Sequence, residues 1–377
     1  MSGVGEFGRG AGGPAGPSGA VPPGGLVPIR GRGAVENPPN RFERIAYMPD
    51  AEARDPDDPA PQTQVLRDAT RTIIARNDSP DVGFETSVNP YRGCEHGCIY
   101  CFARPFHEYL GFSLGLDFET KILAKPDAAE LLRAELMKPS WEPRFIALSG
   151  VTDPYQPVER RLRITRRVLE VLAEFRNPVG IVTKSHLVTR DVDLLAELAS
   201  FGAAAVHVSL TSLRPELQRI MEPRAATPAR RLAAVETLAK AGVPVGALVA
   251  PVIPGLTDEE MPAILRAAAD AGARTAGYVL LRLPYGVKDL FEGWLDQHMP
   301  DRKEKILGRL RDARGGQLYE SRWHERMRGG GAYADQLKQL FEAARRKAGL
   351  EHRLTELSTA AFRRPDPRGQ LGLFDGG

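Results

Sequence analysis

Three cysteines, Cys94, Cys98 and Cys101, are the only cysteines in this 377-residue chain, and all three lie in one eight-residue segment. Thiolates are favoured ligands of iron–sulfur clusters, and a [4Fe–4S] cluster has four irons to coordinate. Three thiolates in a C-x3-C-x2-C arrangement can bind three of these irons and leave the fourth free to coordinate a small molecule. The spacing therefore predicts a reactive [4Fe–4S] cluster.

Two other uses of the three cysteines need to be weighed. Disulfide bonds do not suit them, because three closely spaced cysteines pair poorly and leave one unpaired. A structural zinc site is the second alternative, with either His96 or His107 as the fourth ligand. The pattern of elements that follows the cysteines favours the cluster.

After the cysteines, short apolar segments of β-type residues alternate with helical patterns of 10–15 residues. This alternation indicates parallel strands joined by crossover helices, and so an α/β fold built as a partial, TIM-like (βα)6 barrel. Strands are expected at Glu85–Asn89, Phe145–Leu148, Val179–Thr183, Ala205–Leu210, Val245–Ala250 and Ala276–Leu281. Helices are expected at Thr165–Phe175, Val192–Ala199, Pro228–Ala241 and Asp258–Ala271. A further strand and helix are expected at Phe118–Leu123 and Ala128–Met137.

Polar residues lie at the ends of several expected strands or follow them. In βα barrels the chemistry lies at the carboxyl ends of the strands, so these residues are candidates for cofactor binding. They are Ser149, Thr152, Asp153, Lys184, Ser209 and Arg224. A surface ion-pair role is the alternative for Lys184 and Arg224.

The cysteine pattern, with the aromatic Tyr100 directly before the last cysteine, resembles the signature of the radical S-adenosylmethionine (SAM) enzymes. Three further motifs are similar to the spore photoproduct lyase-related group of that superfamily. They are Asn-Pro-Tyr-Arg-Gly-Cys, Thr-Asp-Pro-Tyr-Gln-Pro-x-Glu and Glu-Pro-Arg, which lie between Asn89 and Arg224. The resemblance implies a [4Fe–4S] cluster, SAM on its open iron, and a 5′-deoxyadenosyl radical that abstracts hydrogen. It also implies a flavodoxin- or ferredoxin-type electron donor.

The same resemblance implies roles for individual residues. Ser149, Thr152 and Asp153 match by position a segment that holds the SAM amino group, and Tyr100 is expected beside the cofactor. The remaining candidates are expected at the SAM carboxylate or ribose: Lys184 and Ser209 at either group, and Arg224 at the carboxylate, which suits a guanidinium.

One departure from the lyase pattern affects the expected reaction. Spore photoproduct lyase uses an additional cysteine as a hydrogen-atom donor, and no fourth cysteine exists in this chain. A lyase reaction by that route is therefore not expected. Tyr155, Tyr278 or Tyr285 is a candidate radical carrier, and the alternative is that each is a packed barrel aromatic.

Five regions are expected along the chain. Residues 1–39 are predicted to be disordered, since residues 1–33 contain 12 Gly and 5 Pro and little to bury. Residues 40–83 form an N-terminal extension with one strand near Ala69–Ala75, and residues 84–285 form the barrel. Residues 286–362 form a basic helical region, and residues 363–377 form a flexible tail.

The basic helical region and the tail both suggest partners. Residues 302–350 carry an excess of seven positive charges, with Trp323, Tyr319 and Tyr333 interleaved among arginines. This pattern suits nucleic-acid binding, or a solvated face that closes the barrel. The tail resembles the pentapeptide that docks bacterial proteins on the DNA sliding clamp. The matching residues are Gln370, Leu371, Leu373 and Phe374.

The net charge of +3 is too small to assign a partner. No apolar segment reaches the roughly 20 residues that cross a bilayer, so a cytoplasmic protein without a membrane partner is expected. The leading hypothesis is a radical SAM enzyme acting on a nucleic acid in a repair-like reaction. The alternatives are a radical SAM enzyme acting on RNA or a small metabolite, and a non-catalytic, metal-stabilised module that binds nucleic acid.

Overall fold

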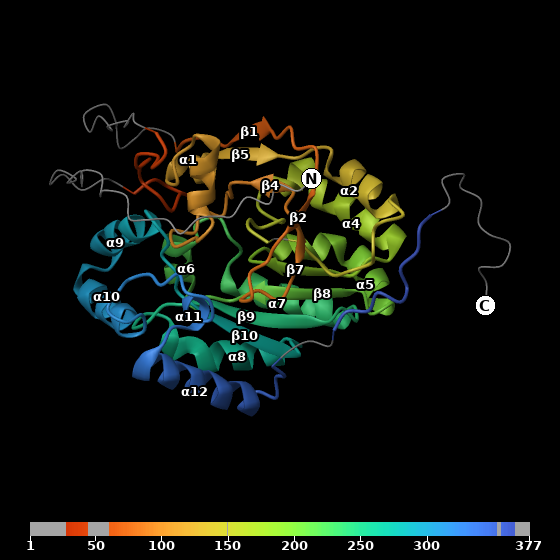
Figure 1. The fold of residues 1–377 in the computed structure, drawn as a ribbon. Helices are drawn as coiled ribbons and strands as arrows, with labels where there is room; N and C mark the ends of the chain where they lie inside the picture. The colour runs from red at the N-terminus through yellow and green to blue at the C-terminus, as the bar shows by residue number, and fades with distance from the viewer. Residues whose placement is uncertain (1–27, 44–59, 149, 353–355, 366–377) are drawn as a thin grey trace.

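The computed structural model describes residues 28–43, 60–148, 150–352 and 356–365. Six parallel strands form the centre of the molecule, and each pairs with the next one along the chain (Figure 1). They are β3 (Thr86–Val88), β6 (Ile146–Leu148), β7 (Val179–Thr183), β8 (Ala204–Ser209), β9 (Val245–Val252) and β10 (Thr275–Leu280). A seventh strand, β2 (Ile74–Arg76), pairs antiparallel with β3. The predicted α/β fold with six parallel strands is confirmed.

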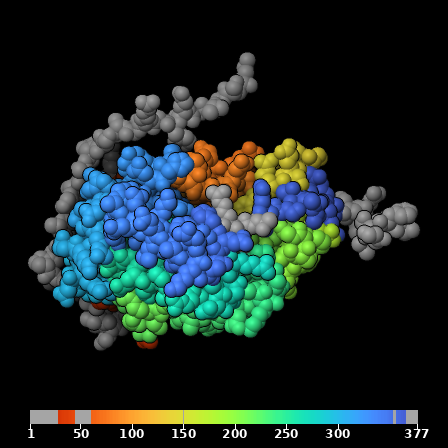
Figure 2. Space-filling model, turned by 90° about the horizontal axis from the view of Figure 1, so that it is seen from below, coloured from red at the N-terminus to blue at the C-terminus, as the bar shows by residue number. Residues whose placement is uncertain are grey.

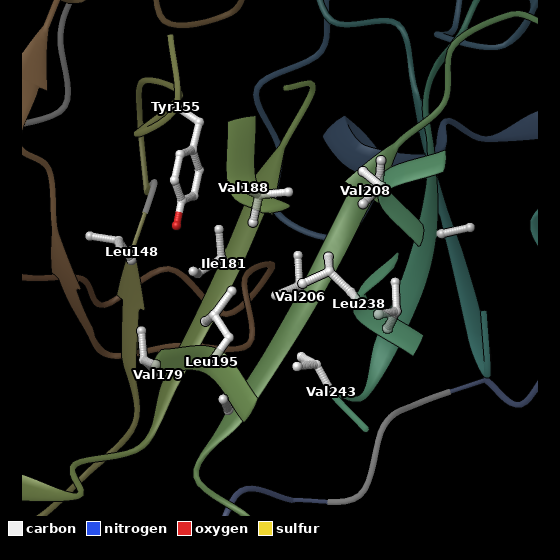
Figure 3. Close-up of a cluster of buried hydrophobic side chains, with 14 of the residues drawn as sticks. Leu148, Tyr155, Val179, Ile181, Val188, Leu195, Val206, Val208, Leu238 and Val243 are labelled. Carbon is white, nitrogen blue, oxygen red and sulfur yellow. The ribbon is translucent and has the colours of Figure 1, made fainter. Parts of the chain in front are cut away.

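The two faces of the sheet differ in what they contact. In β7, Val179 and Ile181 are fully buried and belong to the large core cluster, whereas Val182, the residue after Ile181, is 36% exposed. Alternate side chains of a strand point to opposite faces. Figure 3 shows Val179 and Ile181 in one cluster with Leu195 and Val188, on the side covered by helices. The other face, with Val182, lines the interior of the barrel.

Helices cover the outer face of the strands, as the alternating pattern predicts. They are α2 (Ala128–Met137), α4 (Ile164–Phe175), α5 (Val192–Ser200), α7 (Pro228–Lys240) and α8 (Met261–Asp270). Helix α6 (Pro215–Met221) packs instead near Ile99, whose backbone N–H donates to the carbonyl oxygen of Met221 over 3.0 Å. Short helical turns precede two of the covering helices: η2 (His186–Asp191) and η3 (Asp258–Glu260). The helix expected from Asp258 therefore starts as a 3-10 turn and becomes α-helical at Met261.

The structure corrects two of the predicted strands. The expected strand Phe118–Leu123 is instead the end of helix α1 (Leu116–Thr120) followed by β5 (Lys121–Ala124). β5 lies outside the barrel, between β1 (Gln64–Arg67) and β4 (Tyr91–Arg92). In the expected strand Ala69–Ala75 only the last two residues are extended, as the start of β2.

Residues 28–40, here called the N-terminal strap, lie on the barrel domain. Ile29, Ala34 and Asn40 are buried, and the Asn40 side-chain amide donates to the carbonyl oxygen of Glu108 over 2.8 Å. The disorder predicted for residues 1–39 is therefore wrong for residues 28–39. The rest of that prediction falls on residues 1–27, outside the described residues.

The C-terminal region is helical, as predicted. Its elements are α9 (Val287–His298), η4 (Pro300–Arg302), α10 (Lys303–Asp312), α11 (Glu325–Arg328) and α12 (Gly331–Lys347). α12 packs on α8, and the Phe341 ring lies 4.7 Å from the ring of Tyr278. Figure 2 shows this segment, in blue, covering one face of the molecule. None of the helices in the described ranges is long and apolar enough to span a bilayer.

The start of the expected flexible tail is held in place. Arg363 N donates to the carbonyl oxygen of Phe175 over 3.0 Å, and the Arg364 guanidinium donates to carbonyl oxygens of Lys138 and Trp141. The clamp-like motif from Gln370 to Phe374 lies outside the described residues and stays a prediction.

Candidate metal centre

The three cysteines lie in a loop between β4 and the short helix η1 (Arg104–Leu110). Cys94 and Cys98 are buried, and Cys101 is partly buried. Backbone hydrogen bonds fold the loop on itself: Cys101 N donates to Cys98 O over 3.2 Å, and Gly97 N donates to Cys94 O over 3.4 Å. Gly97 has a φ of +65°, a left-handed conformation that favours glycine.

Arg104 anchors this cysteine loop from the inside of the protein. Its side chain is fully buried, and its Nε donates to the carbonyl oxygen of Cys98 over 3.0 Å. Its Nη1 donates to the carbonyl oxygens of Leu114 (3.1 Å) and Gly115 (2.9 Å), and its Nη2 forms an ion pair with Glu119. One guanidinium therefore connects the cysteine loop to the start of α1.

Glu119 in turn fastens the N-terminal strap. Its carboxylate oxygens accept hydrogen bonds from the backbone N–H groups of Gly33 (2.9 Å) and Ala34 (2.8 Å). A Cβ atom on Gly33 would meet the carbonyl oxygen of Gly97 at 1.8 Å, so the strap touches the cysteine loop backbone to backbone. Neither Arg104 nor Glu119 was predicted as a functional residue from the sequence.

The Thr-Asp-Pro-Tyr-Gln-Pro motif after β6 braces the other side of the loop. Thr152 Oγ1 donates to the carbonyl oxygen of Tyr91 over 2.8 Å. Gln156 uses both ends of its amide: its Nε2 donates to Gly93 O over 3.1 Å, and its Oε1 accepts from Glu95 N over 2.9 Å. The motif thus holds the loop backbone in place.

Asp153 from the same motif connects the loop to β7. Its Oδ1 accepts from Thr183 Oγ1 over 2.8 Å, and its Oδ2 accepts from Lys184 N over 2.7 Å. The Nδ1 atom of buried His96 lies 3.4 Å from Oδ2. Asp153 and Thr152, which were expected at the SAM amino group, are engaged with protein groups in this structure.

Tyr100 belongs to a buried polar network on the α6 side of the loop. Its hydroxyl donates to the Glu222 carboxylate, which also accepts from Thr211 Oγ1 over 2.7 Å and pairs with Arg231. Burial by itself would raise the pKa of Glu222, but Arg231 and Lys184 outweigh it and lower that pKa to about 2. Glu222 is therefore a buried carboxylate that fixes Tyr100.

Lys184 and Ser209 occupy matching positions on neighbouring strands. Every second side chain of β7 and β8 faces the barrel interior, and Lys184 and Ser209 belong to these two series at the carboxyl ends of the strands. The Lys184 Nζ donates to the carbonyl oxygen of Ala250 over 3.3 Å and lies 6.0 Å from the centre of the Tyr100 ring. A cation and a hydroxyl group are thereby brought to the side of the cysteine loop that faces the interior.

Arg224 takes a different position. Its Nη1 lies 2.9 Å from Glu95 Oε1 and donates to Thr63 Oγ1 over 3.1 Å. Its backbone N–H donates to the carbonyl oxygen of His96 over 3.2 Å, so Arg224 also supports the loop. Ser149 lies outside the described residues.

A pocket of about 540 Å³ opens beside Arg224. Among the residues that the structure describes, four arginines line it, namely Arg30 and Arg32 of the strap, Arg161, and Arg224, and the one carboxylate among these lining residues is Glu95. Glu95 pairs with Arg224, so among the described lining residues the guanidinium charges outnumber the carboxylate charge and favour an anion. We call this cavity the arginine pocket.

The donor set fits an iron–sulfur cluster. Burial raises the pKa of all three thiols, and the charge of Asp153 adds to this effect at Cys94. A thiolate at these positions needs a positive charge beside it, which iron ions supply. No three or more Cys, His, Asp or Glu side chains in the described parts of the chain gather round a single metal-ion position.

His107, one candidate for the fourth zinc ligand, is part of the packing behind the loop. Its ring lies 5.2 Å from that of Phe112 and 5.6 Å from that of Phe118, and its Nε2 is buried without a hydrogen-bond partner. Burial lowers the pKa of His107 from 6.5 to about 4. The folded protein therefore holds this imidazole neutral at pH 6.

This lowered pKa predicts a loss of stability in mild acid. Between pH 6.5 and pH 4 the unfolded chain binds a proton at His107 that the folded chain does not, so stability falls as pH falls through that window. The full contribution is about 3 kcal/mol. Urea unfolding at several pH values measures it. His107→Phe should flatten the curve between these limits, and an equal slope in both proteins would contradict the assignment.

Of the three tyrosines considered as radical carriers, two are packed aromatics. Tyr155 is fully buried, and Figure 3 shows its ring among Leu148, Ile181 and Val188 on the helix-facing side of the sheet. Tyr278 is also buried, against Phe341. Tyr285 is exposed.

The geometry defines a class of protein: an open α/β barrel that holds a three-cysteine loop beside the carboxyl ends of its strands. Residues 88–268 match the model of the radical SAM superfamily. This part of the chain, just under half of its length, is therefore similar to the radical SAM superfamily.

Individual proteins are also similar to this chain. An uncharacterized protein of Mycobacterium tuberculosis is 41% identical over 220 residues, which cover 58% of this chain and 65% of the relative. An uncharacterized protein of Methanocaldococcus jannaschii is 29% identical over 178 residues, which cover 47% of this chain and 64% of the relative. The chain thus spans just under two thirds of the length of these relatives.

Solved structures share the fold. A spore photoproduct lyase mutant has a TM-score of 0.54 at 16% identity, over 76% of this chain and 80% of that chain. Spore photoproduct lyase complexed with dinucleoside spore photoproduct has a TM-score of 0.52 at 17% identity, over 75% of this chain and 78% of that chain.

Proposed function

We propose that this protein is a radical SAM enzyme that abstracts a hydrogen atom from a nucleic-acid substrate. The observation that carries the proposal is the loop of three cysteines, held by Arg104 and by the Thr152–Gln156 segment against the interior of a parallel barrel. Cys94, Cys98 and Cys101 would hold the [4Fe–4S] cluster. When bound, the cluster and SAM supply the reducing electron and the 5′-deoxyadenosyl radical.

The residues of the chain position and protect this chemistry. Lys184 and Ser209, at the interior-facing ends of β7 and β8, are proposed to bind the SAM carboxylate or ribose. Tyr100, fixed by Glu222, is proposed to border the cofactor. Thr152, Asp153 and Arg224 hold the loop in the structure, and their direct contact with SAM is also part of the proposal. The helices round the strands exclude water from a reactive radical.

The case for a nucleic acid rests on charge and on a neighbour in fold. The arginine pocket presents several guanidinium groups to solvent near the cysteine loop, which suits backbone phosphates. A solved spore photoproduct lyase with the same fold carries bound AdoMet and a dinucleoside spore photoproduct. Docking of the Gln370–Phe374 segment on a sliding clamp, and reduction by a flavodoxin or ferredoxin, belong to the same proposal.

Anaerobic reconstitution followed by a SAM-cleavage assay tests the proposal. The reduced protein is incubated with SAM and with irradiated DNA, undamaged DNA, RNA, or no substrate. At least one nucleic acid carrying deuterium at its sugars and bases is expected to transfer deuterium to 5′-deoxyadenosine. SAM cleavage without deuterium transfer from any nucleic acid would favour a small metabolite as the substrate. One zinc ion per chain and no SAM cleavage would favour a non-catalytic module.

A further inference from the structure

Exposed aromatic side chains gather at one edge of the cysteine loop. Eight large hydrophobic side chains in the described part of the chain are exposed, and five of these come from three segments that meet beside η1. These five, which we call the aromatic rim, are Phe42, Phe102, Phe106, Tyr109 and Tyr285. Their exposed fractions run from 39% to 66%.

Arg41 joins three of these rings. Its guanidinium carbon lies 3.9 Å from the centre of the Tyr285 ring, 4.6 Å from that of Phe42 and 5.4 Å from that of Tyr109. The Phe42 and Tyr109 rings are themselves 4.8 Å apart. Glu108, on the same short helix as Tyr109, pairs with Arg41 over 3.2 Å and keeps it in position.

The rim continues to the cysteine loop. Phe102 directly follows Cys101, and the guanidinium of Arg282 lies 5.2 Å from the centre of its ring. Arg282 and Tyr285 come from the same loop after β10, so both ends of the rim are reached by one segment. Phe106 and Tyr109 are three residues apart on η1, which places them on one side of that helix.

Half-exposed rings next to guanidinium groups are the combination that binds unpaired nucleobases. Every base has a π-face that can stack on an aromatic side chain, and arginine adds a cation–π contribution. Bases within a duplex are stacked on each other and cannot use such a surface. An enzyme that reacts with a base must also take that base out of the stack.

We infer that the aromatic rim binds unpaired nucleotides by base stacking and so feeds a single strand, or bases extruded from a duplex, toward the cysteine loop. This inference rests on the proposed function, whose substrate class it narrows. It also identifies a binding surface that is separate from the arginine pocket and from the residues expected to hold SAM.

The test measures binding without chemistry. A fluorescent single strand is titrated with cluster-loaded protein, without reductant, and anisotropy reports the affinity. Replacing Phe42, Tyr109 and Tyr285 together by alanine should weaken binding by at least about tenfold. A strand of abasic sites should bind the wild type as weakly as the intact strand binds this variant. The affinity for a duplex of the same sequence should change least between the wild type and the variant.

Matched variants separate stacking from folding. Leu340→Ala removes another exposed apolar side chain, on α12, and should leave the affinity unchanged. If the alanine variant does not fold, Phe42→Leu with Tyr285→Leu keeps apolar bulk but removes two π-faces, and should still weaken binding. Equal affinity of the rim variants and the wild type, or equal binding of abasic and intact strands, overturns the inference.

The outcome is distinguishable from failure of the proposed function. A protein that binds single strands through the rim but cleaves no SAM would refute the enzyme and leave the rim intact. A protein that cleaves SAM but binds single strands independently of the rim would refute the inference about the rim and leave the proposed enzyme activity intact. Self-association lost in the rim variants, with unchanged strand affinity, would assign the surface to a second copy of the chain and also overturn the inference.

Discussion

Replacing Cys98 by alanine is expected to remove most of the bound iron and to reduce 5′-deoxyadenosine formation to background. Two thiolates cannot hold a cubane cluster that three are needed to bind, and the fourth iron has no protein ligand to compensate. Cys98 is also the residue whose carbonyl oxygen Arg104 holds, so the substitution removes the thiolate from the best-anchored part of the loop. Iron analysis and a SAM-cleavage assay under dithionite measure the two effects.

The fold should survive this substitution. The barrel core, with residues such as Val206 and Leu238, lies on the helix-facing side of the sheet and does not depend on metal as a zinc finger does (Figure 3). Near-wild-type circular dichroism would therefore accompany the loss of about four irons per chain. Continued 5′-deoxyadenosine formation by the Cys98→Ala protein under reducing conditions would refute the assignment of the cluster.

Arg104→Met is expected to lower the free energy of unfolding by about 3–5 kcal/mol and to impair cluster retention. Methionine fills the space but leaves the buried Glu119 carboxylate without its cation, and the carbonyl oxygens of Cys98, Leu114 and Gly115 without a donor. Lysine should not rescue the variant, because one ammonium group cannot reproduce the fork of a guanidinium. Urea unfolding and iron retention after gel filtration report the result.

Two controls make this prediction specific. Arg133→Met removes an arginine paired with Glu174 at the surface, where 46% and 32% of the two side chains are exposed, and should cost less than about 1 kcal/mol. The double variant Arg104→Met with Glu119→Leu removes both charges and should be more stable than Arg104→Met alone. Equal destabilisation by the two single substitutions would mean that Arg104 has no special structural role.

The strands of the barrel and the location of the cluster could be predicted because both leave local signals. Val179–Thr183 was predicted residue for residue, since a short β-branched segment between helical patterns has few other interpretations. Cys94, Cys98 and Cys101 were identified by spacing alone. In both cases the information lies within a few neighbouring residues.

Features that depend on distant contacts could not be predicted. The segment around Phe118 contains β-type residues, yet its first part is helical and ends α1. The side-chain amide of Asn37, about 80 residues earlier, holds this helix at Asp117: it accepts a hydrogen bond from the Asp117 backbone N–H and donates one to the Asp117 carboxylate. Similarly, the sequence shows which polar residues follow a strand, but it does not show which groups their side chains contact. Asp153 was expected to face SAM and instead accepts hydrogen bonds from Thr183 and Lys184.

The contact between the N-terminal strap and Glu119 has a consequence for how the protein is made. Gly33 and Ala34 leave the ribosome some 85 residues before Glu119, whose carboxylate they bind. The chain emerges N-terminus first, so these two backbone N–H groups lack their Glu119 partner during that interval. The face of the cysteine loop that the strap later covers is therefore open to the surroundings of the nascent chain until Glu119 has been synthesised.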